Sequence, residues 1–188
     1  MSSQNIRKMV TTAILVALTI VFQLLRPFLG GSNIVSTYII GSLVNLALIV
    51  AACVVGLWSG VSVAVIAPLI AVWQGHATLV TLPGIVLGNV VLVVLYALFA
   101  RRDSRSLKVE WVRWSVVGAV AALAKYAVIV LGVALVQSLP SLAAFQNTVA
   151  VMAVKQLTQI FTALIAMVLG GLVLPALPAS AMGLKPGK

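Results

Sequence analysis

The sequence predicts an all-α integral membrane protein, a bundle of six transmembrane helices forming one membrane domain over residues 1–188. Hydrophobic residues make up 63% of the chain and charged residues only 7%, and the apolar residues gather in successive long runs. Soluble domains carry about 25% charged residues, whereas a run of about 20 apolar residues is what a helix needs to cross the hydrocarbon core. A polytopic membrane protein is therefore the expected class.

Turn-forming residues separate the first three expected helices. The run 8–28 stops at Gly-Gly-Ser-Asn (30–33), residues that favour a turn over a helix. The run 38–58 follows, and Ser59-Gly60 divides it from a third run, 59–73, which is short for a membrane span. We therefore expect two full spans and one short helix in the first half.

The second half contains three longer runs. Gln-Gly-His (74–76) precedes the run 79–100, and Ser-Leu-Pro-Ser (138–141) ends the run 111–137. The last run covers 148–177. We expect each of the three to form one helix across the membrane.

The distribution of positive residues predicts that both termini are cytoplasmic. With the N-terminus inside, the outer connections hold only Arg26. The inner side then collects Arg7, Lys8, Arg101, Arg102, Arg105, Lys108, Arg113, Lys185 and Lys188. Lysine and arginine concentrate on the cytoplasmic side of membrane proteins, so this orientation is favoured.

Two lysines, Lys125 and Lys155, lie within apolar runs that contain no Asp or Glu. A charged side chain near the bilayer centre costs about 2.5 to 3.5 kcal/mol on insertion scales, so intramembrane charges usually have a functional partner. Because no carboxylate is available there, an anionic ligand is the natural partner.

Other polar residues lie at similar depths in the expected helices. At 1.5 Å of rise per residue, the distance from the outer end is about 10 Å for Asn45 and Lys155, about 15 Å for Asn89, about 17 Å for Gln159 and about 18 Å for Lys125. Gln156 adjoins this group in the sequence. Polar groups are costly against lipid, so we expect them to converge on a cavity open to the outside.

Each candidate also has a structural interpretation. Amides such as those of Asn45, Asn89 and Gln156 commonly hold transmembrane helices together. Lys155 is close enough to the interface to extend toward it, whereas Lys125 lies too near mid-span to do so without strain. These alternatives stay open from sequence.

His76 follows the short third helix, where it is either a solvated loop residue or part of the cavity mouth. With one His, one Cys and two acids in the chain, we expect no metal site and no cofactor. The segment 183–188 lacks the spacing of a phosphate-binding loop, so any ATP hydrolysis belongs to another chain and we expect no enzyme.

Several segments resemble one family, the substrate-binding S components of energy-coupling factor (ECF) transporters. The resemblance spans nearly the whole chain and rests on Arg7-Lys8-Met9-Val10 with Ala13-x-x-x-Ala17, on Gly41 to Asn45, on the short third helix with Pro68, and on Leu82 to Asn89. It implies a non-catalytic subunit in the bacterial plasma membrane that binds a vitamin or similar micronutrient. Partners would be a transmembrane coupling (T) subunit, docked on Ala13 and Ala17, and two ABC ATPase subunits.

No signature for riboflavin, thiamine, biotin or folate is evident, so the lysines supply the only constraint on substrate. They favour a carboxylate- or phosphate-bearing molecule over a cation. Two alternatives are a structural membrane protein of the cell-wall machinery, in which the polar residues only join helices, and a small secondary transporter. The transporter is weakened by the lack of an intramembrane carboxylate.

Overall fold

The computed structural model describes residues 3–31, 33–100, 110–139 and 149–177, and in these ranges the regular elements are all helices. The α-helices are α1 (Ser3–Leu24), α2 (Ile34–Val50), α3 (Leu57–Trp73), α4 (Leu82–Leu95), α5 (Trp111–Gln137), α6 (Val149–Gln156) and α7 (Thr158–Ala176). A 3-10 turn, Pro27–Leu29, follows α1, and π-helical turns extend α2 (Ala51–Val55) and α4 (Tyr96–Ala100).

Length and composition allow five of the helical segments to cross a membrane. They are Ser3–Leu29, Ile34–Val55, Leu82–Ala100, Trp111–Gln137 and Val149–Ala176. Leu57–Trp73 is apolar but shorter, as the sequence indicated for the third helix. The all-helical membrane class is confirmed, whereas the sixth span and the orientation of the termini stay predictions.

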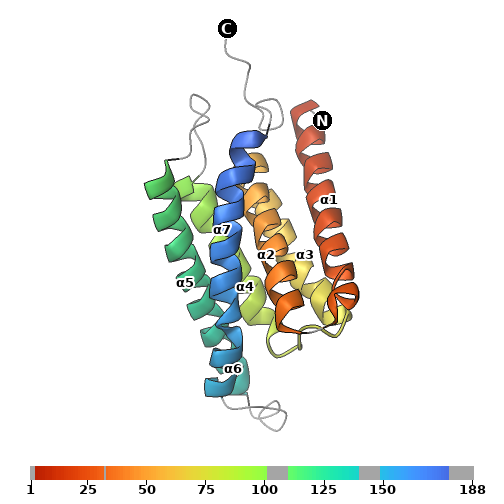
Figure 1. Cartoon of the computed structure of the whole chain (residues 1–188), viewed down its shortest axis with the longest axis vertical. Helices are drawn as coiled ribbons and strands as arrows, with labels where there is room; N and C mark the ends of the chain where they lie inside the picture. The colour runs from red at the N-terminus through yellow and green to blue at the C-terminus, as the bar shows by residue number, and fades with distance from the viewer. Residues whose placement is uncertain (1–2, 32, 101–109, 140–148, 178–188) are drawn as a thin grey trace.

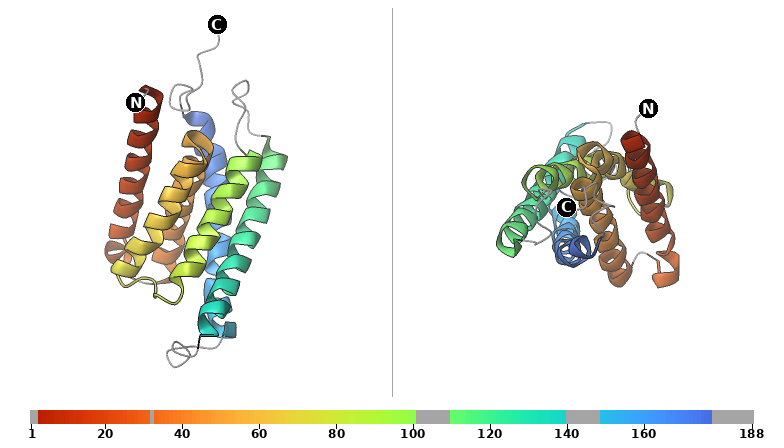
Figure 2. Two further views of the ribbon diagram at one scale, coloured as in Figure 1. Left: turned by 180° about the vertical axis from the view of Figure 1, so that it is seen from behind. Right: turned by 90° about the horizontal axis from the view of Figure 1, so that it is seen from above.

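The helices form a bundle in which the start of α1 and the end of α7 lie at the same end (Figure 1). Seen from above, α1 and α5 stand at opposite edges, with α2 and α7 between them (Figure 2). In the packing, α4 lies against α3 and α5, α7 against α2 and α5, and α1 against α3. The core includes Leu48, Ile49, Val63, Leu92 and Ala122, all nearly inaccessible to solvent.

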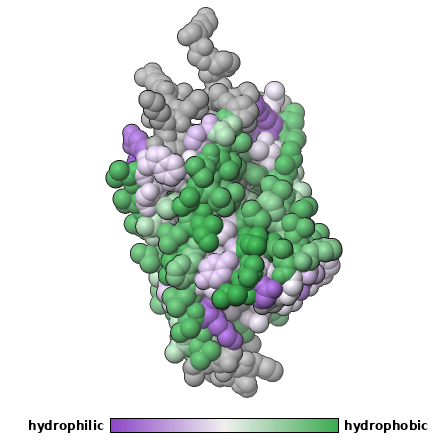
Figure 3. Space-filling model, in the orientation of Figure 1, coloured by the Kyte–Doolittle hydropathy of each residue, from purple (hydrophilic) through white to green (hydrophobic). Residues whose placement is uncertain are grey.

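Apolar side chains also cover most of the outer surface along the helices (Figure 3). Exposed examples include Leu18, Val120, Phe161 and Leu172 on three different helices. In water such a surface would be unfavourable, but lipid tails solvate it without cost. The hydrophilic patches visible in this view gather toward the two ends of the bundle.

Several helix boundaries differ from the sequence prediction, and two of the differences have a clear local cause. The second helix begins at Ile34 rather than at 38, because Asn33 caps it by accepting a 2.7 Å hydrogen bond from the Ser36 backbone N–H. The joint before the third helix lies at Gly56, whose φ of 129° favours glycine, and not at Ser59-Gly60. Gly60 lies inside α3, where an added Cβ would stand 2.5 Å from a Val93 methyl carbon, so it serves close packing.

Glycines allow α4 and α5 to approach closely. A Cβ on Gly132 would lie 2.6 Å from the Gly84 Cα, and one on Gly88 would lie 2.9 Å from the Lys125 carbonyl oxygen. The Gly84-x-x-x-Gly88 pattern thus packs the inside of the bundle. This contact places the backbone of Lys125 directly against α4.

Candidate functional site

A cavity of about 680 Å³ lies at the end of the bundle where α1 ends and α2 begins. Its walls come from α1 to α7, because the ends of α1 and α3, the starts of α2 and α4, the middle of α5 and the α6–α7 junction meet there. All seven predicted substrate-binding residues line it: Asn45, His76, Asn89, Lys125, Lys155, Gln156 and Gln159. The convergence expected from helix depth is therefore present in the geometry.

Lys125 is the most deeply buried cation of the cavity, with 2% of its surface exposed. Its Nζ donates a 2.6 Å hydrogen bond to Asn45 Oδ1, and Asn45 Nδ2 donates one of 3.1 Å to Thr162 Oγ1. The Thr162 hydroxyl in turn donates to the Gln159 backbone carbonyl at 3.2 Å. These bonds join α5, α2 and α7, so Asn45 has a structural role as well as a place in the cavity wall.

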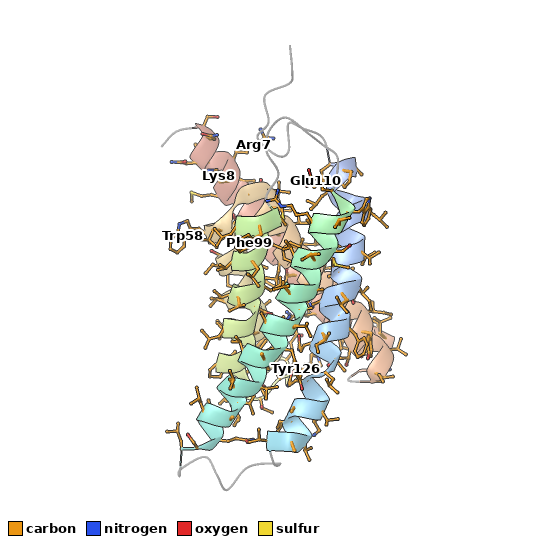
Figure 4. The ribbon with its side chains drawn as sticks, turned by 90° about the vertical axis from the view of Figure 1, so that its left-hand side faces the viewer. Arg7, Lys8, Trp58, Phe99, Glu110 and Tyr126 are labelled. Atoms are coloured by element: carbon orange, nitrogen blue, oxygen red, sulfur yellow. The ribbon has the colours of Figure 1, made fainter. Side chains whose placement is uncertain are left out.

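The bond to Asn45 uses one of the three donors that a lysine ammonium carries. Asn45 is neutral, so the hydrogen bond leaves the charge of Lys125 uncompensated. Glu110 is the acidic residue among the described residues, and it stands at the opposite end of the bundle from the cavity, the same end as Arg7 and Lys8 (Figure 4). The charge of Lys125 is thus available to an anion.

Lys155 reaches the same cavity from the end of α6, but it is exposed rather than buried as the sequence suggested. The helix is interrupted at Leu157, and α6 contributes no buried residue to the core. Lys155 therefore belongs to α6, whereas Thr158 and Gln159 belong to α7, and all three line the cavity. Lys155 stands at the solvent-accessible side of the site and Lys125 at its base.

Asn89 is buried and bound to α3. Its Nδ2 donates to the Ala64 backbone carbonyl at 3.5 Å. That carbonyl has no helical partner at position 68, because Pro68 carries no N–H. Asn89 therefore occupies an acceptor that the proline leaves open, while its own Oδ1 has no hydrogen-bond partner among the described residues.

Gln23 and Arg26 also line the cavity, and the sequence reasoning did not include them as site residues. The Gln23 Nε2 donates a 2.9 Å hydrogen bond to the Ala67 carbonyl of α3, and its Oε1 has no partner among the residues that the structure describes. Arg26 donates from Nη1 to Thr37 Oγ1 at 3.5 Å, and within the same described ranges its Nε is unpaired. Their spacing of three residues, which places both on one face of a helix end, was the available signal.

His76 lies at the rim of the cavity, in the turn after α3. Partial burial lowers the pKa of its imidazole below the ordinary value, and the positive charge of Arg26 lowers it further. Both causes favour neutral His76 at physiological pH. The positive charge near the rim therefore comes from Arg26 and Lys155.

A second depression of about 790 Å³ lies between α1 and α3 at the other end of the bundle. The predicted docking residues Ala13 and Ala17 line it and are exposed. Thr12 Oγ1 donates a 2.8 Å hydrogen bond to Ser59 Oγ at its base, and Trp58 at its edge is 81% exposed. Trp58 and Lys8 lie at the same end of the molecule in Figure 4.

The described residues contain no group of three or more His, Cys, Asp or Glu side chains able to hold a metal ion. The cavity lining combines amides, hydroxyls and cations with apolar side chains such as Ile40 and Val44, a mixture typical of sites that bind a small organic molecule.

The fold and the cavity define a polytopic helical membrane protein with a solute-sized site at one end of its bundle. A family model for the ECF transporter substrate-specific component matches residues 7–182, and the chain belongs to that family. Comparison with curated proteins and with solved structures found no match. The resemblance seen in the sequence is therefore confirmed.

Members of this family are membrane subunits that bind a small-molecule substrate and associate with T and ATPase subunits. They are transport components and not enzymes. The assignment disfavours a cell-wall scaffold and supports a substrate-specific membrane subunit.

Proposed function

We propose that this protein captures an anionic micronutrient, a vitamin or similar compound bearing a carboxylate or phosphate, for an ECF-type importer in the bacterial plasma membrane. One observation carries the proposal: the ammonium of Lys125 is buried in the cavity wall, and its hydrogen-bond partner among the described residues is the neutral amide of Asn45. Burying a charge is costly unless an opposite charge meets it. An anionic group on the substrate supplies that charge.

The other cations of the cavity support the same chemistry. Arg26 comes from the end of α1 and Lys155 from the end of α6, so positive groups approach the cavity from two further helices. None of the described residues that line the cavity is acidic. A cationic substrate would be repelled by all three side chains, which is a basis for specificity.

In this proposal the amides of Asn45, Asn89, Gln156 and Gln159 orient the substrate, and His76 contributes to the rim. The cavity faces outward and both termini are cytoplasmic. Arg7, Lys8 and Arg113 support this orientation because they lie on helix ends away from the cavity. Ala13 and Ala17 then lie near the inner face, where the coupling subunit would dock and the two ABC ATPase subunits would supply energy.

The first test is mass spectrometry of the small molecules released when the gently purified protein is denatured. We expect one compound at near-stoichiometric amount that carries a carboxylate or phosphate. Recovery of a cationic compound, or of lipid alone, would contradict the proposal.

A further inference from the structure

Two buried oxygens in the cavity wall, Gln23 Oε1 and Asn89 Oδ1, have no hydrogen-bond partner in the described part of the chain. Their residues are 4% and 3% exposed, and both line the cavity. An unpaired buried acceptor is destabilising, so a native protein that retains two of them in one cavity usually has a use for them.

The hydrogen bonds made by the two amide nitrogens determine that the oxygen of each amide is the atom left for a ligand. Gln23 Nε2 donates to the Ala67 carbonyl, and Asn89 Nδ2 donates to the Ala64 carbonyl that Pro68 leaves without a helical donor. Carbonyl oxygens only accept hydrogen bonds, so each amide must point its nitrogen at α3 and keep its oxygen as the remaining group. Both side chains therefore present acceptors.

The two carbonyls that hold these amides lie close together. Ala64 and Ala67 are three residues apart on α3, which is about 4.5 Å along the helix axis. The amides come from α1 and α4, and both of these helices pack on α3. We call Gln23 Oε1 and Asn89 Oδ1 the acceptor pair. It belongs to the α3 wall, whereas Lys125 is held by Asn45 to α2.

We propose that the acceptor pair binds a hydrogen-bond donor edge of the substrate, so that the substrate carries N–H or O–H groups apart from its acidic group. This inference rests on the proposed function, since it assumes that the cavity holds the anionic substrate. The cationic groups bind one part of the molecule, and the acceptor pair selects the other. Amide, ureido, amino or hydroxyl groups fit; a plain fatty acid or a simple dicarboxylate does not.

Neighbouring atoms cover both oxygens, so the substrate reaches them after a small movement of side chains. The gain on contact is large because the acceptors are otherwise unpaired. A site built to receive a donor discriminates strongly against an analogue that lacks it.

The test uses the compound released from the purified wild-type protein and two derivatives of it. In one derivative the N–H or O–H donors are methylated, and in the other the acidic group is esterified. Affinities of all three are measured by calorimetry for wild type, Asn89→Leu and Lys125→Met. We expect methylation to weaken binding about tenfold or more in wild type and by a clearly smaller factor in Asn89→Leu, because one of the two acceptors is already gone there.

Equal losses on methylation in wild type and Asn89→Leu would overturn the inference, as would a released compound without any donor apart from its acid. Gln23→Met gives the same comparison on the other acceptor if Asn89→Leu does not fold. Failure of the proposed function gives a different result: esterification of the acidic group would then reduce affinity by the same factor in wild type and in Lys125→Met. Lipid as the only bound molecule would overturn both.

Discussion

Replacing Lys125 by methionine should separate its role in binding from its role in stability. Methionine keeps the length and the unbranched chain, so α5 retains its packing. A hydrogen bond to a charged group contributes about 1.5 to 3 kcal/mol, and each 1.4 kcal/mol is a factor of ten in affinity. We therefore expect Kd for the anionic substrate to rise about 10- to 150-fold.

The stability of the unliganded protein should change little. The substitution removes a buried charge, which is a gain of about 2.5 to 3.5 kcal/mol on insertion scales. It also removes the 2.6 Å bond from Nζ to Asn45 and leaves Asn45 Oδ1 unpaired, which costs about 1 to 3 kcal/mol. The two effects nearly cancel.

Calorimetric titration and thermal unfolding in detergent measure the two quantities on the same samples. Lys8→Met is the matched control, since Lys8 lies at the end of the bundle away from the cavity. If Lys125 only holds helices together, Lys125→Met should lower the unfolding temperature and leave affinity as in the control. That result would refute the reasoning.

Three further predictions concern other parts of the fold. Ala13→Leu should project a larger side chain into the depression between α1 and α3 and abolish copurification with the coupling subunit while Kd stays unchanged; retained copurification would contradict the docking role. Gly84→Ala should destabilise the bundle by about 1 to 3 kcal/mol in denaturant unfolding, because its Cβ would lie 2.8 Å from the Ile129 carbonyl oxygen; an unchanged midpoint would contradict this packing. Burial and the charge of Arg26 hold the pKa of His76 below about 6.5, so its contribution to stability is present above pH 6.5 and is lost as pH falls. In thermal unfolding measured between about pH 7 and 5, His76→Asn should lose less stability than wild type as the pH falls. A pH profile identical to that of wild type would exclude His76 as the source of the loss.

The cost of placing polar groups in lipid explains how much of the site could be predicted from sequence. Lys125, Asn45 and Asn89 interrupt apolar runs, and the penalty for exposing them to lipid requires that they face inward. Rise per residue then placed them at similar depths, which is where the structure brings them together. These two steps need only hydropathy and helix geometry.

The rest depends on tertiary contacts that leave no local signal. Gly56 and Gly60 both lie in apolar sequence, so the sequence does not tell which of them separates the two helices. In the structure Gly56 has a positive φ and separates them, whereas Gly60 packs against Val93. Lys155 is exposed near the end of α6, a helix without buried residues, although its sequence is largely apolar. Gln23 and Arg26 have the spacing of one helix face, but only the hydrogen bond from Gln23 to the Ala67 carbonyl of α3 shows how that face is held against the cavity.

One helix pair, α1 and α3, borders both the cavity and the predicted docking surface. Thr12 bonds to Ser59 at the docking end, and Gln23 bonds to the Ala67 carbonyl at the cavity end. A displacement of α1 along or away from α3 must break the second bond or carry Gln23 out of the cavity wall. Coupling of this kind needs no long pathway, because the packed α1–α3 interface joins the cavity to the predicted docking surface. Contact of a partner with Ala13 would therefore act directly on half of the acceptor pair, while Lys125, held to α2, would be left in place.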